Sequence, residues 1–223
     1  MLRVKRNLGA ETQDPIDCRL GIESQDVFKT DPLWKPYFHE TGIYWTCRDV
    51  FADSVIANYE KLGRKADLKA LPVSEARKLY GGLFEDADYD GVKEVLVNKT
   101  SGWGAAGDCL LAVTREAVKL GVKYVTVEVT GLQIDDRGRC TGVKTTKGQQ
   151  LTAEHVILCT GAYTAKLLEL SAKSSGRNDL SADGRIVAGG ITTGMVKLDD
   201  DKLYEKFASM PVGVQGYTAE LGQ

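Results

Sequence analysis

HVILCTGAYTAKLL, residues 155–168, predicts a buried strand, a tight turn and the beginning of a helix. Residues 155–159 form a nearly continuous apolar run, which is typical of a strand covered on both faces of a sheet. Thr160–Ala162 supply a turn with a glycine at its centre, and a helix is expected over 163–171. This stretch therefore places the chain among proteins that combine helices with a buried sheet.

The residues before this stretch predict a helix and then several strands. Apolar side chains recur at helical spacing over 103–120, and Gly121 ends the helix. A strand rich in β-branched residues is expected over 122–129. Three shorter strands then form a β-meander over residues 132–135, 140–145 and 150–152.

Both ends of the chain predict further helices and strands. Toward the N-terminus we expect a short helix over 21–29, a strand over 42–47, a helix over 50–62 that stops at Gly63, and a short helix that begins at Pro72. Toward the C-terminus we expect strand-like residues over 186–198, a helix over 199–208 and a strand over 211–217. Together these elements predict an α/β plus α+β chain.

Composition and charge exclude several classes of protein. Of the 223 residues, 43% are hydrophobic and 27% are charged, as in ordinary globular proteins. The net charge is −2 and no basic stripe stands out, so we expect no nucleic-acid partner. No apolar run has the length of a membrane span or the form of a signal peptide, so we expect an intracellular protein, cytoplasmic or peroxisomal, without a membrane partner.

The chemically versatile side chains do not indicate a metal site. The five cysteines are scattered and never form a CxxC pair, which fits reduced thiols better than a disulfide framework or a zinc site. His39 and His155 are the only histidines, which excludes a histidine-rich centre. His39 and Glu40 are neighbours on a probable strand, so they point to opposite faces and direct pairing is not expected. The acidic run 199–201 is expected to complement a helix dipole rather than to bind a metal.

A glycine-rich stretch at 102–107, GWGAAG, is a literal GxGxxG motif. A strand-like segment precedes it, a helix follows, and Glu128 lies near the end of the next strand, as in dinucleotide-binding units. The spacing argues against this function, because residues 98–101 separate the first glycine from the strand. The alternative is a polar loop in which Thr100 or Ser101 caps a helix that begins with small residues.

Five blocks of sequence carry a resemblance to a known family. They are DPLWKPYFHETG at 31–42, NKTSGW at 98–103, LGVK at 120–123, VILCTGAYTAKLL at 156–168, and the segment from MVKL to MPV at 195–212. In order and spacing they resemble the fungal fructosyl-amino-acid oxidases (amadoriases) and saccharopine oxidases of the glycine/D-amino-acid/sarcosine oxidase superfamily. Each block is short, but together they cover nearly the whole chain.

The resemblance implies an FAD-binding, Rossmann-like domain and a substrate domain with a mixed β-sheet, interleaved along the chain. Residues 1–37 and 97–167 would belong to the flavin domain, and residues 38–96 and 168–223 to the substrate domain. In that family the phosphate-binding glycines precede the position of Met1, and the residues beside the flavin ring follow the last position matched here. The chain is therefore expected to be a middle portion, with its catalytic residues elsewhere and its glycine stretch at 102–107 marking the re-entry into the flavin domain.

The resemblance also assigns six residues to FAD: Val129, Thr160, Gly161, Ala162, Lys5 and Arg6. Val129 matches a strand whose backbone contacts the adenine, and the turn at Gly161 matches one near the FAD phosphates, where a missing Cβ permits close approach. Lys5 and Arg6 match a basic stretch close to the flavin. On the residues alone, a strand-to-helix turn is the better explanation of Gly161, and the two basic residues are at least equally well explained as a solvated pair.

The function implied by the resemblance is oxidation of a secondary amine in an amino-acid derivative, giving an imine and hydrogen peroxide. Fructosyl, N-methyl, saccharopine and pipecolate-type substrates all fit this chemistry. Two alternatives are a non-catalytic module that binds a ligand or partner, and a small Rossmann-type reductase that uses the GWGAAG stretch. We also expect self-association through an exposed sheet edge, because residues 155–159 would lack a covering strand.

Overall fold

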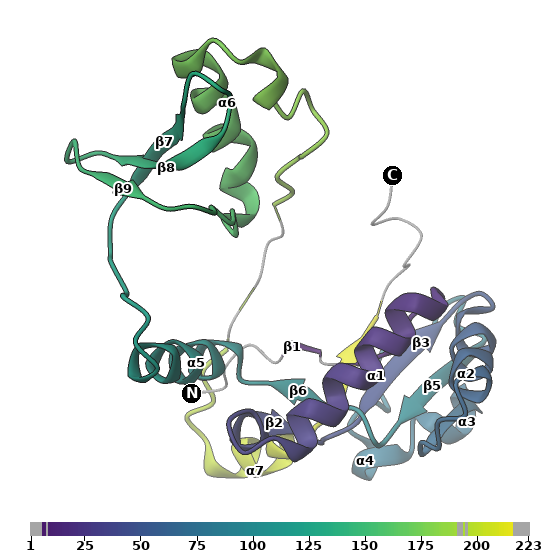
Figure 1. The fold of residues 1–223 in the computed structure, drawn as a ribbon. Helices are drawn as coiled ribbons and strands as arrows, with labels where there is room; N and C mark the ends of the chain where they lie inside the picture. The colour runs from purple at the N-terminus through teal and green to yellow at the C-terminus, as the bar shows by residue number, and fades with distance from the viewer. Residues whose placement is uncertain (1–5, 8, 191–193, 195, 216–223) are drawn as a thin grey trace. The chain divides into compact units, whose positions relative to one another are not determined.

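The computed structural model describes residues 6–7, 9–190, 194 and 196–215. Lys5 and parts of the two predicted C-terminal strands, residues 191–193, 195 and 216–217, lie outside the described residues. The chain forms two compact units, and Figure 1 labels most of their helices and strands. Unit 1 comprises residues 1–121 and 195–223, and unit 2 comprises residues 122–194.

Unit 1 is built around a four-stranded sheet of mixed orientation. In spatial order its strands are β10 (Val212–Val214), β3 (Ile43–Cys47), β5 (Glu94–Asn98) and β4 (Leu68–Pro72). β10 runs parallel to β3, whereas β5 is antiparallel to both β3 and β4. The predicted strand over 42–47 and the predicted mixed sheet are confirmed.

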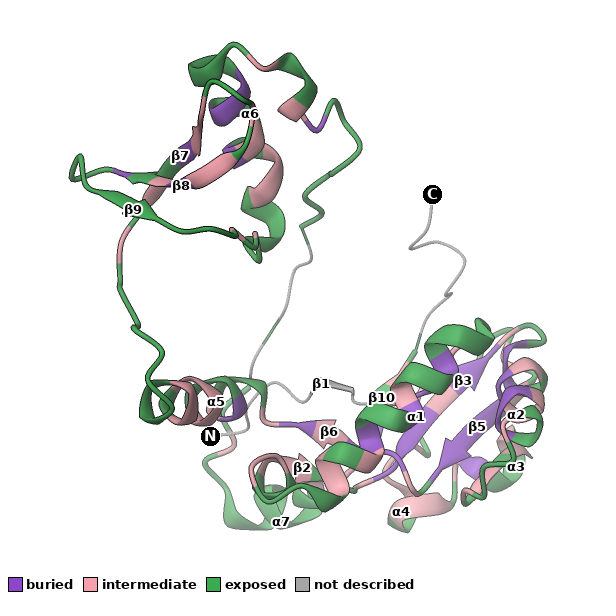
Figure 2. Ribbon diagram, in the orientation of Figure 1, coloured by how far each residue is buried: buried purple, intermediate pink, exposed green. Residues whose placement is uncertain are grey.

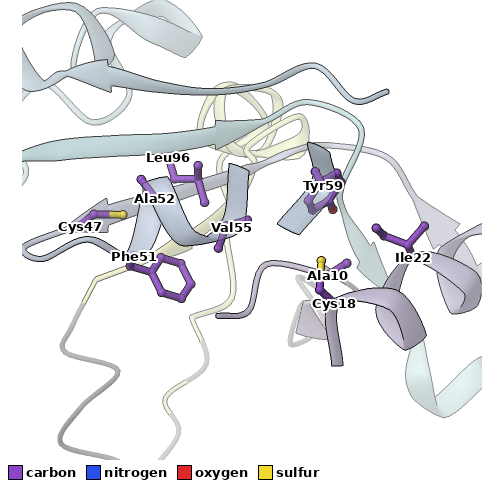
Figure 3. Packing of buried hydrophobic residues seen from close by; sticks show 9 residues of the cluster. All are labelled: Ala10, Cys18, Ile22, Cys47, Phe51, Ala52, Val55, Tyr59 and Leu96. Atoms are coloured by element: carbon purple, nitrogen blue, oxygen red, sulfur yellow. The ribbon is translucent and has the colours of Figure 1, made fainter. Parts of the chain in front are cut away.

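Apolar side chains cover this sheet on both faces, because neighbouring residues of a strand point in opposite directions. On one face Leu96 belongs to the cluster shown in Figure 3. That cluster consists of Ala10, Cys18, Ile22, Cys47, Phe51, Ala52, Val55, Tyr59 and Leu96. On the other face Val95 and Val97 pack with Tyr44 and Ala76. β5 is therefore the centre of the unit, and each fully buried aliphatic side chain contributes about 1.5–3 kcal/mol.

Two helices carry most of the first cluster, α1 (Pro15–Thr30) and α2 (Phe51–Lys61). α1 begins where the side chain of Asp14 accepts hydrogen bonds from the N–H groups of Ile16 and Asp17, at 2.7 and 3.0 Å. Pro15 suits the first helical position, where no donor is needed. Because the cap at Asp14 starts α1 at Pro15, this helix is longer than the one predicted over 21–29. α2 confirms the helix predicted over 50–62.

A smaller antiparallel sheet holds the glycine-rich stretch. Its strands, in spatial order, are β1 (Arg6–Asn7), β6 (Trp103–Gly104) and β2 (Phe38–His39). The short helix η1 (Lys35–Tyr37) precedes β2, and α5 (Ala106–Lys119) follows β6. α5 confirms the helix predicted over 103–120, except that it begins at Ala106.

The remaining helices of unit 1 are short: α3 (Val73–Ala76), α4 (Leu79–Gly82) and α7 (Asp201–Ala208). The side chain of Asp200 caps α7 by accepting a hydrogen bond from the N–H of Leu203 at 3.0 Å. The acidic run therefore stands at a helix N-terminus, as its sequence predicts.

Unit 2 is a β-meander with a helix packed against it. Its strands are β7 (Val129–Ile134), β8 (Cys140–Thr145) and β9 (Gln150–Thr152), in this spatial order. η2 (Gly161–Tyr163) leads into α6 (Thr164–Ser175), and η3 (Asn178–Leu180) follows. The meander and the helix after Ala162 are thus confirmed.

Ser171 joins the helix of unit 2 to the sheet. Its Oγ accepts a hydrogen bond from the N–H of Leu132 on β7 at 2.9 Å, and both residues are buried. Leu167 and Ala172 are buried on the same helix, and Figure 2 shows buried residues on both α6 and β7. The core of this unit is therefore small and lies between one helix and one strand.

Two predicted strands, over 122–129 and 155–159, are not formed, apart from Val129, which begins β7. Residues 122–128 and 155–159 have no regular secondary structure and are largely exposed, with Tyr124 at 70% and Ile157 at 85%. No strand of the described chain pairs with either segment, and a strand buried on both faces needs such neighbours. The parallel sheet of the expected Rossmann-like domain is therefore not assembled within the described residues. The described residues of 186–198 contain no strand either.

The interleaving of flavin and substrate domains stays a prediction. The boundary between the two units, after Gly121, lies inside the range 97–167 expected for the flavin domain. Residues 168–194 share unit 2 with residues 122–167. The two units are defined by how compactly their residues pack, whereas the predicted domains are defined by which ligand they bind. The boundary between the units therefore does not decide which segments face FAD.

A buried polar network joins the N-terminal segment to the end of β5. Glu11 is 6% exposed, and its Oε1 accepts hydrogen bonds from Ser101 Oγ and from Asn98 Nδ2. Asn98 Nδ2 also lies 3.3 Å from Tyr59 Oη, and Gln25 Nε2 donates to Ser101 Oγ at 3.1 Å. Oε2 of Glu11 has no partner among the described residues. Burial raises the pKa of Glu11, although the bonds from Ser101 and Asn98 act to lower it.

Replacing Glu11 by Gln should remove part of the pH dependence of unit 1 stability. The pKa of Glu11 in the folded state is raised above its ordinary value of 4.5, so the protonated form favours folding. The stability that protonated Glu11 contributes is fully present below pH 4.5. It is lost as the pH rises through the raised pKa of the folded state. The free energy of unfolding of the wild type should therefore fall with rising pH relative to that of Glu11→Gln.

Urea titrations followed by tryptophan fluorescence measure this effect, because Trp34, Trp45 and Trp103 all belong to unit 1. Glu23→Gln is the matched control, since the Glu23 side chain on α1 is 64% exposed. The control should keep the wild-type pH profile. If the free energies of unfolding of the wild type and of Glu11→Gln change with pH in the same way, burial does not raise the pKa of this carboxyl.

Candidate functional site

The glycine-rich stretch at 102–107 is used for packing within unit 1. Trp103 and Gly104 form the central strand of the small sheet, so their backbone pairs with β1 and β2. The N–H of Ala105 donates to the carbonyl of Tyr37 at 2.9 Å. The backbone here is therefore engaged in pairing rather than open to a phosphate, which argues against the reductase interpretation.

Gly102 is required by a close backbone contact. A Cβ at this position would lie 2.0 Å from the backbone oxygen of His39, at the end of β2. The expected cap of the following helix by Thr100 or Ser101 is wrong, because Ala105 occupies the N-cap position of α5. The hydroxyl of Ser101 is directed instead to Glu11 in the buried network.

Gly102→Ala should destabilise unit 1 by about 1–3 kcal/mol, because the backbone of His39 must move to admit the new methyl group. Gly107→Ala is the matched control in the same stretch. It lies in α5 with no atom within 4 Å of its Cβ position beyond the helix's own backbone, and alanine favours a helix by about 0.5–1 kcal/mol. Urea denaturation compares the two variants, and equal effects would contradict the packing role of Gly102.

Unit 2 contains a cavity of about 530 Å³, which is within the usual range for small-molecule sites. Three parts of the unit meet at it: the segment that enters β7, the turn at Thr160, and α6. The lining residues are 127–130, Thr160, Tyr163, Lys166, Leu167 and Leu170. The cavity thus has both apolar walls and groups able to hydrogen-bond.

One face of the helical segment supplies four of the nine lining residues. Tyr163, Lys166, Leu167 and Leu170 follow the spacing i, i+3, i+4 and i+7, which places them on one side of a helix. Leu167 is buried, whereas Tyr163 is 74% exposed and Leu170 is 43% exposed. Apolar and aromatic area is therefore left open beside the cavity, where a planar ligand would gain by covering it.

The turn before α6 forms another part of the site. Thr160 Oγ1 lies 2.8 Å from Thr164 Oγ1, which ties the turn to the first turn of the helix. Gly161 has a φ of +53°, a conformation that favours glycine, and no atom lies within 4 Å of its Cβ position. The backbone conformation explains the glycine, and the space beside it is open.

Two of the residues that the family resemblance assigns to FAD line this cavity. Val129 begins β7 and Thr160 ends the segment before η2, and both line the cavity. Gly161–Ala162 follow in η2 and are not among the lining residues. Arg6 contributes backbone to β1 in unit 1, and Lys5 lies outside the described residues. The assignment of these residues to FAD stays a prediction.

The cavity suits the adenosine and phosphate part of FAD. Tyr163 and Leu167 offer area for a planar base, and Thr160 offers a hydroxyl. Lys166 brings a positive charge suited to a phosphate, and Glu128 brings oxygens that can accept from ribose hydroxyls. Sequence reasoning did not identify Tyr163 and Lys166, although the helical spacing after Thr160 places them on one face.

Other reactive side chains do not form a second site. The His39 ring stacks on Trp103 with centroids 4.1 Å apart, while Glu40 Oε2 forms an ion pair with Lys29 Nζ at 2.8 Å. Within the described ranges, no three His, Cys, Asp or Glu side chains are placed to hold a metal ion. None of the helices in this part of the chain is long and apolar enough to cross a membrane.

Solved structures share this fold. The deglycating enzyme fructosamine oxidase (Amadoriase II) of Aspergillus fumigatus is 26% identical with a TM-score of 0.61, over 74% of this chain and 40% of that one. A modified fructosyl peptide oxidase from Aspergillus nidulans is 22% identical with a TM-score of 0.60, over 75% and 41%. The L-proline dehydrogenase of P. horikoshii is 22% identical with a TM-score of 0.60, over 76% and 44%. The chain thus spans about two fifths of the length of these proteins.

The sequence comparison gives the family. No curated protein matches the chain by sequence. Residues 10–191 match the family described as DAO, FAD dependent oxidoreductase, and this range includes the whole cavity. The predicted superfamily, the mixed α/β fold and FAD as the cofactor of the family are confirmed. By this match over most of its length, the chain belongs to the DAO family of FAD-dependent oxidoreductases.

Proposed function

We propose that this protein takes part in FAD-dependent oxidation of a secondary amine in an amino-acid derivative, with an imine and hydrogen peroxide as products. The observation that carries the proposal is the cavity of unit 2, which is lined by both Val129 and Thr160. The names of the structural neighbours support the substrate class, because fructosyl peptides and proline both contain a secondary amine.

The chemistry that bound FAD supplies is the uptake of a hydride equivalent from the C–N unit and its transfer, with protons, to molecular oxygen. The residues of this chain bind and orient the distant end of that cofactor. The backbone at Val129 would meet the base, Leu167 would exclude water from it, and Thr160 and Lys166 would meet the phosphates. Fructosyl, N-methyl, saccharopine and pipecolate-type amines all remain substrates of this proposal.

A non-catalytic module that binds a ligand through the same cavity is the second candidate function. The observation that favours it is the placement of the lining residues, which includes no acid–base pair or nucleophile with a base beside it. Such a module would bind FAD without releasing peroxide from any amine. Peroxide release in the presence of secondary amines therefore separates the two functions.

Thr160→Glu should weaken FAD binding by about tenfold or more, because the longer side chain fills the cavity and its charge opposes the phosphates. Quenching of FAD fluorescence during titration with the full chain measures the dissociation constant, and flavin absorbance that co-elutes in gel filtration confirms the complex. Peroxide release from a panel of secondary amines is then measured on the same samples.

Thr152→Glu is the matched control, because Thr152 is an exposed residue on β9 that does not line the cavity. It adds the same charge to the same unit and should leave FAD binding unchanged. If both variants bind FAD as tightly as the wild type, FAD does not occupy this cavity.

We propose further that the chain self-associates through its two exposed, unpaired segments, residues 122–125 and 155–159. Val122, Tyr124 and Val125 are each more than half exposed, and Ile157 is 85% exposed. Apolar segments with free backbone groups favour pairing with another chain. A second copy of this chain presents the same segments and is therefore a suitable partner.

Ile157→Lys should shift the chain from dimers or larger assemblies toward monomers, because a charge cannot enter a paired apolar interface without loss of hydration. Light scattering coupled to gel filtration gives the mass at several concentrations. Val187→Lys is the control, since Val187 is 82% exposed in the same unit but outside both segments. A wild type that is monomeric at all concentrations would end this proposal.

A further inference from the structure

Residues 9–13 of unit 1 form a strap that lies between β1 and α1 in the sequence and has no regular secondary structure. Asn58 on α2 holds one end of it, because its Nδ2 donates to the carbonyls of Thr12 and Gln13 at 3.1 and 3.0 Å. Nearer the other end, Ala10 is 1% exposed and belongs to the apolar cluster in Figure 3. The strap is therefore attached to the core of the unit at two points.

Between these two attachments lies Glu11, which is the only ionisable residue of the strap. Its Oε1 accepts hydrogen bonds from Asn98 Nδ2 at 2.7 Å and from Ser101 Oγ, while its Oε2 has no partner among the described residues. The charged residue of the same loop, Lys99, forms an ion pair with Asp67 at 3.5 Å. The carboxyl of Glu11 is therefore held by neutral donors.

The titratable groups that face Glu11 from the two neighbouring helices do not balance a negative charge. They are Cys18 and Lys29 on α1 and Tyr59 on α2. Burial raises the pKa of Cys18 and that of Tyr59, so both side chains are neutral at neutral pH. The ammonium group of Lys29 forms an ion pair with Glu40 at 2.8 Å.

A negative charge on Glu11 consequently costs more in the attached strap than in water. Burial raises the pKa of this carboxyl above its ordinary value of 4.5. The protonated form therefore favours the attached strap. Its contribution is fully present below pH 4.5 and is lost as the pH rises through the raised pKa.

The first strand of unit 1 depends on this strap, whereas the larger sheet and its helices do not. The two residues of β1 pair with Trp103 and Gly104 of β6, and a strand pair this short is not stable alone. α1 has its own cap at Asp14, and β5 is paired along both edges. Detachment of the strap therefore removes β1 but leaves these elements their own hydrogen bonds.

We propose that the strap is a pH-sensitive device, which ionisation of Glu11 detaches together with β1 while the rest of unit 1 stays folded. Detachment uncovers one backbone edge of β6, whose other edge stays paired with β2. The inference is independent of the proposed FAD site, because the strap belongs to unit 1 and the cavity to unit 2.

Amide hydrogen exchange of the full chain, followed by mass spectrometry at several pH values, tests this proposal. After correction for the effect of pH on chemical exchange, peptides that cover the strap are compared with peptides that cover β5. The N–H of Thr12, which donates to the carbonyl of Ala10 at 3.0 Å, reports on the strap. Its protection should fall by up to about tenfold for each pH unit above the raised pKa, because opening is coupled to the loss of one proton. The protection of β5 should stay constant.

Three variants separate the charge of Glu11 from the other attachments of the strap. Glu11→Gln keeps the shape without the charge, so protection of the strap should not change with pH. Asn58→Ala should lower this protection at every pH but keep its dependence on pH, because Glu11 is still present. Glu23→Gln, at a side chain that is 64% exposed, should behave as the wild type.

Two results would overturn the proposal. Protection of the wild-type strap that does not change with pH would show that ionisation of Glu11 does not detach it. Equal losses of protection in the strap and in β5 would show that this ionisation destabilises unit 1 as a whole. Neither result bears on FAD binding, which is measured separately.

Discussion

Hydrogen bonding along both edges of a strand decides which apolar segments of this chain are buried. β5 pairs with β3 on one side and with β4 on the other, and Val95–Val97 have no exposed area. Residues 155–159 are similarly apolar, but no strand of the described chain pairs with them, and Ile157 is 85% exposed. A buried peptide group without a partner costs about 1–3 kcal/mol, which offsets much of what an aliphatic side chain gains by burial.

This constraint explains which parts of the fold the sequence predicts. α2, β3 and the meander of unit 2 are predictable because their signals are local, such as the stop at Gly63 and the turn at Gly138, both with positive φ. Residues 122–128 and 155–159 carry an equally clear local signal for strands. Their outcome depends on neighbours that are distant along the chain, and periodicity contains no information about those neighbours.

The candidate site shows the same division between local and distant information. The resemblance to a family indicates Val129 and Thr160. The helical spacing after Thr160 is enough to place Lys166 on the same helix face as Tyr163 and Leu167. The GWGAAG stretch has the letters of a phosphate loop, yet a carbonyl of His39 fixes the role of Gly102. A glycine that meets a ligand and one that meets a distant strand look alike in sequence.

The cavity of unit 2 is lined in part by Val127 and Glu128, which lie just after the unpaired segment 122–125. Val129 pairs with Thr145 on β8, and the carbonyl of Glu128 accepts a hydrogen bond from the N–H of Thr146 at 3.1 Å, whereas residues 122–127 belong to no strand. A ligand that contacts Val127 and Glu128 favours conformations in which this segment is held in place. A strand that pairs with the segment favours the same conformations. Two binding events that select one conformation strengthen each other by the same factor, so cofactor binding and association of this chain are expected to be coupled.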